Sequence, residues 1–353
     1  MISAPESIRT FDLSFPLAYN VASFACPLYI PRMTSLTVST RTTEMNIGKL
    51  KWDVLGFGVV AVDDLIYVDR YPQPDTKIPM QGQRREGGGL TGTALVAAAR
   101  LGVKAAYGGV LGDDELSRFT IQALEREGVD CTPVLYQAGA RPYYAVIIVD
   151  QATGQRTIFY SSDGAVKRRP DQITDELIAS CRVLFVDYTL SDGGLRAVQL
   201  AHAHGIPVVG DIEQETAPGV EEMMPQIDHL IVGIELAGRV TGETDPDRMV
   251  RALSRPDRAC CVVTAGERGC WYSERGGKVR HFSAYQVNVV DTTGCGDVFH
   301  GAYAACIARG ESVERAVRVA TATAGIKATQ PGGRSGIPDL STVERFLVSQ
   351  GTL

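Results

Sequence analysis

The stretch VDTTGCGDVFHGAY at residues 290–303 places two glycines and an acid directly ahead of an apolar run. Its small and hydroxylated residues leave backbone N–H groups bare, and the run after Asp297 predicts a buried helix. A helix N-terminus has unsatisfied donors and about half a positive charge, and glycines let an anion reach the backbone. We therefore expect a strand at 286–290, a phosphate-binding turn at 292–296 and a helix from near Asp297.

A purely capping role for Asp297 and two different phosphate-binding motifs fit the sequence less well. An aspartate at the start of a helix is often only an N-cap, but a cap alone would not require Gly-Cys-Gly before it. Gly56-Phe-Gly-Val-Val-Ala matches the dinucleotide fingerprint, yet the residues after it favour a strand where the fingerprint needs a helix. The Gly-Lys pairs at 48–49 and 277–278 do not complete a Walker A loop.

The composition is that of a globular enzyme. The 353 residues are 44% hydrophobic and 22% charged, with a net charge of −6. An acidic chain lacks the basic face that nucleic acids require, and no apolar run approaches the ~18–20 residues that cross a bilayer. Eight cysteines without a CxxC pair argue against a disulfide framework or a zinc site. Buried, reduced thiols in a cytoplasmic protein are expected.

Residues 1–50 differ from the rest of the chain. They contain four prolines and many Ser and Thr residues, and they show neither a helical nor a strand period. We expect a disordered or mispredicted N-terminal extension, and an upstream start codon would explain it because Met33 and Met45 follow. Faint similarities to a transit peptide and to a secretory leader are the alternatives.

Residues 51–345 alternate between strand-length apolar runs and helical stretches. This alternation predicts an α/β fold of three αβα layers, with a mostly parallel central sheet. The predicted strands cover residues 53–56, 183–186, 207–210, 230–232 and 260–264. The predicted helices cover residues 92–101, 115–127, 195–204, 246–253, 297–308 and 312–328.

Two regions, at about 63–86 and 141–162, break the alternation because their strands are not followed by helices. Residues 150–154 are typical of a hairpin connection. We expect these strands to form a small β-sheet that acts as a lid over a cleft. The lid has too few strands to bury both faces, so it either forms a homodimer interface or folds onto its own sheet. The apolar residues that suggest an interface are Tyr143, Val146, Ile148, Ile158 and Tyr160.

The motif Asp291-Thr-Thr-Gly-Cys-Gly-Asp297 resembles the D-T-x-G-A-G-D signature of the ribokinase-like, or PfkB, carbohydrate kinases. Further landmarks of that family follow in order over residues 53–340. The resemblance implies a ribokinase-like fold with a β lid, and transfer of a phosphoryl group from ATP to a sugar hydroxyl. It implies that Asp297 is the general base, and that the N–H groups of Gly294, Cys295 and Gly296 form the anion hole.

The other landmarks imply binding roles. The segment 58–63 and the signature at 87–93 would hold the sugar through Asp63, Gly88, Gly89 and Thr93. The loop Thr264-Ala-Gly-Glu-Arg-Gly269 resembles a T-x-G-x-x-G nucleotide loop. The implied ATP-binding residues are Thr264, Gly266, Gly269, Thr292, Thr293 and Gly332.

The resemblance also implies Mg²⁺, and K⁺ near 331–338, where many members hold a monovalent cation. The N-x-x-E stretch that usually organises Mg²⁺ is absent, since Val232-Gly-Ile-Glu-Leu-Ala stands in its place. We nominate Glu235 as its substitute, together with Asp291.

The acceptor is less constrained. Many members hold sugar hydroxyls with two asparagines, and Leu90 and Thr93 stand at the corresponding positions here. Motifs resemble both sulfofructose kinases and ketohexokinases or fructokinases. An anionic acceptor, such as sulfofructose or a sugar phosphate, is predicted from four cations expected on the lid side of the cleft: Lys77, Arg118, Arg141 and Arg156. A neutral-sugar kinase, a nucleoside kinase and a non-catalytic sugar-binding regulator are the alternatives.

Overall fold

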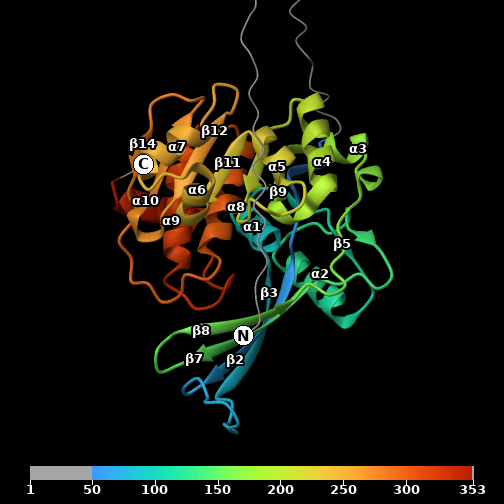
Figure 1. Cartoon of the computed structure of the whole chain (residues 1–353), viewed down its shortest axis with the longest axis vertical. Coiled ribbons are helices and arrows are strands. Elements are labelled where there is room, and N and C mark those ends of the chain that lie inside the picture. Colours follow the sequence, from blue (N-terminus) through green and yellow to red (C-terminus); the bar gives the residue numbers. More distant parts are fainter. Residues whose placement is uncertain (1–49, 352–353) are drawn as a thin grey trace, which may run out of the picture. The chain divides into compact units, whose positions relative to one another are not determined.

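An eight-stranded sheet forms the centre of the protein (Figure 1). The computed structural model describes residues 50–351, so the predicted extension at 1–50 lies almost entirely outside the described residues. The strand order is β14-β13-β12-β11-β10-β9-β1-β4, and neighbouring strands pair in parallel except for β13, which is antiparallel to both β12 and β14. The strands are β1 (Trp52–Phe57), β4 (Ala105–Tyr107), β9 (Cys181–Asp187), β10 (Val208–Asp211), β11 (His229–Gly233), β12 (Cys260–Thr264), β13 (Cys270–Glu274) and β14 (Arg280–Phe282).

Helices cover both faces of this sheet, as predicted. Successive side chains of a strand point to opposite faces, so in β9 Val183 and Phe185 join one apolar core and Leu184 and Val186 the other. The first core packs against α1 (Leu90–Arg100), α2 (Glu115–Arg126), α8 (Cys295–Ala308), α9 (Val313–Lys327) and α10 (Leu340–Ser349). The second packs against α3 (Asp175–Ile178), α4 (Ser191–Ala203), α5 (Val220–Met223), α6 (Ile234–Thr241) and α7 (Pro246–Leu253). Short 3₁₀ helices lie at Pro170–Gln172, Tyr188–Leu190, Met224–Gln226 and Gly266–Arg268.

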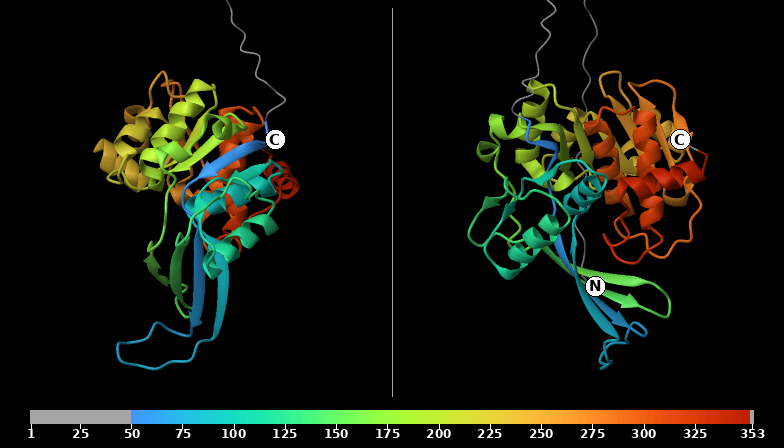
Figure 2. Two further views of the ribbon diagram at one scale, coloured as in Figure 1. Left: turned by 90° about the vertical axis from the view of Figure 1, so that its right-hand side faces the viewer. Right: turned by 180° about the vertical axis from the view of Figure 1, so that it is seen from behind.

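The predicted small sheet is present and projects from the helix-covered domain (Figures 1 and 2). It has the order β3-β2-β7-β8 and consists of β2 (Ala61–Val68), β3 (Gly82–Gly88), β7 (Tyr143–Asp150) and β8 (Arg156–Ser161). Its core contains three buried residues, Leu65, Ala145 and Ile147. A separate parallel pair joins β5 (Val110–Leu111) to β6 (Leu135–Tyr136).

The strand register divides this lid sheet into two faces. Paired residues on neighbouring strands share a face. Asp63 and Leu65 therefore share what we call the inner face with β8 residues Arg156, Ile158 and Tyr160. The outer face carries Val146, Ile148 and Phe159. The apolar set predicted for a dimer interface therefore does not form one surface, because it mixes residues of both faces.

Near the key motif one predicted strand is absent, and the helix after it begins slightly earlier than predicted. Residues 286–290 form no strand: the N–H groups of Val290 and Asp291 both donate to the Ala328 carbonyl, and Val289 and Val290 are 61% and 62% exposed. Helix α8 begins at Cys295 rather than near Asp297, because Gly294 provides its N-cap.

The described cysteines lie mainly in the interior of the protein. The seven cysteines within residues 50–351 are all free thiols, and six of them are buried. In the same part of the chain, every helix is too short or too polar to cross a membrane.

Candidate active site

The turn that opens α8 presents unused backbone donors. Gly294 has a φ of 73°, in the left-handed region that favours glycine. Within residues 50–351, the N–H groups of Gly294, Gly296 and Asp297 have no hydrogen-bond acceptor, whereas that of Cys295 donates to the Thr292 carbonyl at 3.2 Å. A Cβ on Gly296 would meet no atom within 4 Å, so the space above the turn is open. This geometry suits an anion.

Asp291 fixes the shape of this catalytic turn, residues 291–297. Its Oδ1 accepts from the N–H and hydroxyl of Thr293, at 2.8 and 2.6 Å, and its Oδ2 accepts from the Gly332 N–H at 2.9 Å. Burial alone would raise the pKa of Asp291, but these hydrogen bonds hold it below its ordinary value. The buried ammonium of Lys327 donates to the Asp291 carbonyl at 3.0 Å and places positive charge beside the turn.

The Asp297 carboxyl is not used as a helix cap. The N-cap position belongs to Gly294, and no side chain caps α8. Burial, together with the neighbouring carboxylates of Asp211 and Glu213, raises the pKa of Asp297 well above its ordinary value, against the opposing charge of Arg334. A carboxylate with a raised pKa is a stronger proton acceptor, as a general base requires.

Carboxylates gather where the central strands end. Asp187 ends β9 and accepts hydrogen bonds from the Val59 N–H and from Thr91 and Thr189. Asp211 ends β10; its Oδ1 lies 3.4 Å from the His300 Nε2, and its buried Oδ2 has no partner within the described residues. Burial, and then the charge of Glu213, raises the pKa of Asp211.

The predicted sugar-binding residues meet where β2 passes β3. Asp63 lies against Gly88 so closely that a Cβ on that glycine would be 2.1 Å from Asp63 Oδ2. Gly89 has a φ of 86°, and a Cβ there would be 2.6 Å from the Val59 carbonyl oxygen. Burial raises the pKa of Asp63 to about 6.

Arg334 lies at the same place. Its Nη2 donates to the Gly88 carbonyl at 2.6 Å, and its Nε donates to the Thr93 hydroxyl at 3.2 Å. The side chain is buried, and desolvation lowers its pKa to about 10, although the charge of Asp63 opposes the shift. The predicted residues Asp63, Gly88 and Thr93 are therefore brought together by a residue that was not predicted.

The lid touches the catalytic turn through Arg156. Its Nη1 donates to Asp291 Oδ1 at 3.1 Å and to the Thr293 hydroxyl. This contact joins β8 of the inner face to the residues that shape the anion site. Arg156 therefore reaches the turn 291–297 from the lid, but the carboxylate of Asp291 already pairs with it.

The other three predicted cations do not converge. Arg141 donates to the Asp114 carboxylate at 2.8 Å, and Arg118 donates to the Asp113 carbonyl. Lys77 lies on the exposed segment between β2 and β3. The anion-binding group expected from the sequence is not formed, because each cation lies on a different segment.

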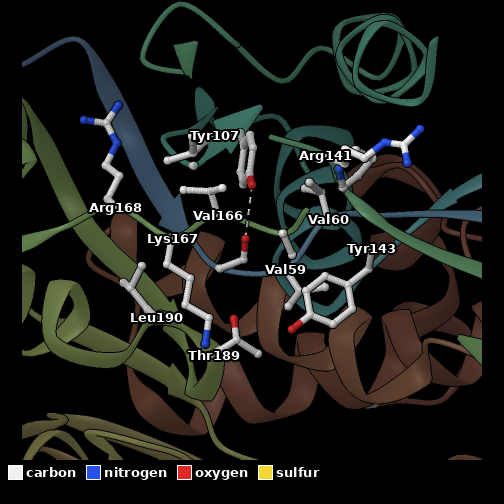
Figure 3. Close-up of a pocket in the computed structure, with 15 residues that line it drawn as sticks. Val59, Val60, Tyr107, Arg141, Tyr143, Val166, Lys167, Arg168, Thr189 and Leu190 are labelled. Atoms are coloured by element: carbon white, nitrogen blue, oxygen red, sulfur yellow. Dashed lines mark hydrogen bonds between the residues drawn. The ribbon is translucent and has the colours of Figure 1, made fainter. Parts of the chain in front are cut away.

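A cavity borders the segment 58–60 that leads into β2 (Figure 3). In Figure 3 the hydroxyls of Tyr143 and Thr189 and the ammonium of Lys167 point to one side of this space, while the guanidinium of Arg141 points away. The cavity is lined by Gly58, Val59, Val60, Tyr107, Gly109, Val110, Arg141, Pro142, Tyr143, Ala165, Val166, Lys167, Arg168, Thr189 and Leu190.

The predicted nucleotide residues lie at the ends of β11 and β12. Thr264 is the last residue of β12, and Glu235 is exposed in the first turn of α6, directly after β11. Gly266 has open space around its Cα, whereas a Cβ on Gly269 would lie 2.0 Å from the Phe282 carbonyl oxygen. Gly266 thus leaves room for a ligand, and Gly269 is required by packing.

Comparison with known proteins decides the family. The model of the pfkB family carbohydrate kinases matches residues 57–340. The chain belongs to the pfkB family of carbohydrate kinases. This pfkB kinase is 31% identical to fructokinase-1 of Oryza sativa subsp. japonica, over 74% of its own length and 88% of the relative. A crystal structure from Agrobacterium tumefaciens, assigned to a ribokinase, has a TM-score of 0.79 and 29% identity, covering 85% of this chain and 98% of that one. A structure from E. coli that holds ATP and Mg²⁺ has a TM-score of 0.71 and 20% identity, covering 84% and 99%.

Four charged residues of the site were missed by sequence reasoning: Arg334, Lys327, Asp211 and Glu213. Asp211 and Glu213 had a usable signal, because acids that follow parallel strands meet at one end of the sheet. Lys327 lies near the end of a predicted helix and has no such signal. Arg334 stands within the segment 331–338 that resembles a family landmark, but only the fold brings it to Gly88.

Proposed function

We propose that this carbohydrate kinase transfers the γ-phosphoryl group of ATP to a hydroxyl of a small sugar, with Asp297 as the general base. The observation that carries the proposal is the position of the Asp297 carboxyl, which is not used as a cap and stands in the first turn of α8. Unused N–H groups of Gly294, Gly296 and Asp297 surround the same turn.

Each residue has a defined task in this reaction. The acceptor hydroxyl gives its proton to Asp297 as its oxygen attacks the γ-phosphorus, and the bond from that phosphorus to the oxygen of the β-phosphate breaks, so that ADP leaves. The unused N–H groups and the α8 N-terminus stabilise charge on the phosphoryl oxygens, and the Lys327 ammonium adds to the positive field. Asp63 accepts a hydrogen bond from another hydroxyl of the sugar. Arg156 draws the lid onto the turn, which keeps water from the phosphoryl group.

Mg²⁺, when bound, neutralises charge on the phosphate oxygens. Mg²⁺ is usually held by one or two carboxylates plus phosphates and waters. Asp291 fits this task poorly, because both its oxygens already accept hydrogen bonds. Asp211 fits better, because its buried Oδ2 has no partner within the described residues, and Glu213 and Glu235 follow neighbouring strand ends. We propose that Mg²⁺ is held by Asp211 with Glu213, the carboxylate whose charge acts on it, since within the described residues Glu235 does not form one metal-binding group with them.

The proposed nucleotide site lies along the ends of β11 and β12, with Thr264 and the open Gly266 in contact with ATP. Thr292, Thr293 and Gly332 are placed on its phosphate side because they belong to, or contact, the catalytic turn.

The monovalent cation predicted near 331–338 stays a prediction. Its test is activity in KCl against activity in choline chloride of equal ionic strength.

A neutral acceptor is the form of the proposal that the charges favour. Arg141 and Arg156 are paired with carboxylates, and Lys77 and Arg118 lie elsewhere, so these four cations form no group that could hold a sulfonate or phosphate. The acids Asp63, Asp297 and Glu86, a residue of β3, also oppose a second anion near the base. The predicted anionic acceptor is the competing outcome.

The deciding experiment is an acceptor screen with ATP and Mg²⁺ over neutral sugars, sugar phosphates, sulfosugars and nucleosides, with phosphorylated product measured directly. We expect turnover of a neutral pentose or ketohexose. Preference for a sulfosugar or a sugar phosphate would restore the anionic proposal. Preference for a nucleoside would point to Tyr143 in the cavity of Figure 3 as a stacking platform. No phosphorylated product from any acceptor would favour a non-catalytic regulator.

We also propose a homodimer formed through the outer face of the lid. β8 is an edge strand of the lid sheet, and Phe159 on the outer face is 56% exposed. Unpaired edges and exposed apolar residues favour association. The test is the molar mass by light scattering at micromolar concentration, where a strictly monomeric protein would contradict the proposal.

The free thiols of the described cysteines support a cytoplasmic location.

A further inference from the structure

Arg334 is a buried guanidinium with one end unused. Its side chain is only 7% exposed, and Nε and Nη2 donate to Thr93 and Gly88. Within residues 50–351, Nη1 of Arg334 has no hydrogen-bond partner. Nη1 is nevertheless not completely buried, so a small part of it stays accessible. Burying an unsatisfied charged donor is costly. Open space therefore reaches a donor that calls for a ligand.

Two glycines make room for this guanidinium. A Cβ on Gly87 would lie 2.4 Å from Arg334 Nη1, and a Cβ on Gly92 would lie 2.4 Å from Nη2. Gly92 is inside α1, where its backbone is helical and glycine costs roughly 1 kcal/mol relative to alanine. Since the backbone does not require glycine there, the reason for it is the space that Arg334 occupies.

The carboxylate of Asp63, which carries the opposite charge, lies near the guanidinium of Arg334. Asp63 packs against Gly88, the residue whose carbonyl accepts from Arg334. Each of these two side chains shifts the pKa of the other through its charge. None of the ion pairs within the described residues joins them, so the two groups are neighbours that do not neutralise each other directly. A donor and an acceptor held in this way suit a hydroxylated ligand.

Resting on the proposed kinase function, we infer that Arg334 is a specificity-determining residue of the acceptor site. Its Nη1 edge donates to one hydroxyl of the sugar, while the Asp63 carboxylate accepts from the neighbouring hydroxyl. The ligand class is a neutral sugar with a vicinal diol. A carboxylate or phosphate is disfavoured at this place, because the charges of Asp63, Asp297, Glu127 and Glu86 already act on the guanidinium.

We call the pair of Arg334 and Asp63 the clamp. The segment that contains Arg334 also contacts the turn of the proposed base. A Cβ on Gly294 would lie 2.9 Å from the Gly333 carbonyl oxygen and 3.4 Å from Thr93 Cγ2. The residue before Arg334 therefore packs on the turn that carries Asp297. The clamp thus sets which of the remaining hydroxyls of the sugar reaches the base.

The test measures KM and kcat for D-fructose and D-ribose in the wild type, Arg334→Gln and Gly92→Ala. Hydrogen bonds to charged groups are worth enough that we expect KM of the accepted sugar to rise about 10- to 100-fold in Arg334→Gln. Gly92→Ala keeps the guanidinium but displaces it, and we expect a rise of the same order. KM at the wild-type value in both folded variants would overturn the inference.

The matched control is Arg258→Gln. Arg258 is also buried, but its donors go to the carbonyls of Ile227, Leu253 and Met224, away from the site. We expect it to lower the melting temperature without changing KM. If Arg334→Gln proves unstable, the double variant Gly92→Ala/Arg334→Gln relieves the clash, so it should melt higher than Gly92→Ala while KM stays raised. A double variant with wild-type KM would contradict the clamp.

Monodeoxy analogues identify the hydroxyl. We expect the wild type to discriminate D-fructose from its 3-deoxy or 4-deoxy analogue, or D-ribose from its 2-deoxy or 3-deoxy analogue, and Arg334→Gln to lose that discrimination for one position. Unchanged discrimination would overturn the inference. A wild type that phosphorylates neither sugar but binds one by calorimetry, with weaker binding in Arg334→Gln, would contradict the kinase proposal and support the clamp. Absence of binding of both sugars would overturn the clamp, while the acceptor screen decides the kinase proposal separately.

Discussion

The catalytic turn and the lid differ in how firmly the fold holds them. The turn opens α8, in which every residue from Val298 to Cys306 is buried. The lid sheet has three buried core residues, and on β8 Ile158 and Tyr160 are 49% and 73% exposed. Regions with few buried contacts open at lower free energy than the core. The proposed base, Asp297, is therefore fixed in advance, while the position of the lid depends on a few contacts such as that of Arg156 with Asp291.

The largest effect is expected from a substitution in the catalytic turn, at the proposed base Asp297. Asp297→Asn should lower kcat by about 10²- to 10⁴-fold, because it removes the base and keeps the shape of the side chain. ATP affinity, measured by equilibrium titration, should stay nearly unchanged. The matched control is Asp245→Asn, since Asp245 is a true cap that accepts from the Arg248 N–H. Activity of Asp297→Asn within about tenfold of the wild type would contradict the assignment.

The rigidity of the packing around α8 can be tested at Gly301. A Cβ there would lie 1.9 Å from the Ala94 carbonyl oxygen of α1, so Gly301→Ala must push α8 and α1 apart. We expect a loss of about 1–3 kcal/mol or more in the free energy of unfolding, measured by urea denaturation. Gly325→Ala in α9 is the control, because its nearest atom would be 3.9 Å away and stability should rise slightly. Equal stability of both variants would show that α1 and α8 can move apart at little cost in free energy.

The lid can be released without touching the core. Arg156→Ala removes a partly exposed ion pair worth up to about 1 kcal/mol, so KM for the sugar should rise roughly two- to fivefold. Amide exchange of residues 143–161 should speed up while that of α8 stays slow, and the melting temperature should not change. A far larger rise in KM for a sugar phosphate than for its neutral relative would instead assign Arg156 to anion binding.

The smallest effect is a pH dependence that originates in the lid. The pKa of Asp63 is raised by burial from 3.8 to about 6, so the folded state binds the proton more tightly than the unfolded chain. The stability that protonated Asp63 contributes is complete below about pH 3.8 and is lost as the pH rises through about 6. Asp63→Asn should therefore remove the share of this group in the fall of the melting temperature between about pH 4 and 6. An unchanged slope would mean that other carboxyls dominate.

Sequence reasoning captured the features that follow from local pattern. The alternation of strands and helices predicted the layered fold, and the strands that lacked helices predicted the lid. It was wrong where tertiary contacts decide: residues 286–290 have the composition of a strand, but the Val290 N–H donates to the carbonyl of Ala328, the residue just after α9, rather than to a neighbouring strand. The cations predicted for the acceptor were grouped by expected location, and the fold gave two of them carboxylate partners. Arg334 could not be predicted, because its site depends on space left by glycines far away in the chain.

The inner face of the lid also has a thermodynamic consequence. Ile158 and Tyr160 share that face with Asp63, and in the absence of substrate they remain in contact with water. A sugar that lies between the lid and the catalytic turn removes this apolar surface from water, which makes the heat capacity change of binding negative. Calorimetry over a range of temperatures would then record the lid as well as the ligand: the enthalpy of sugar binding becomes more favourable on warming, and Tyr160→Ser reduces that slope.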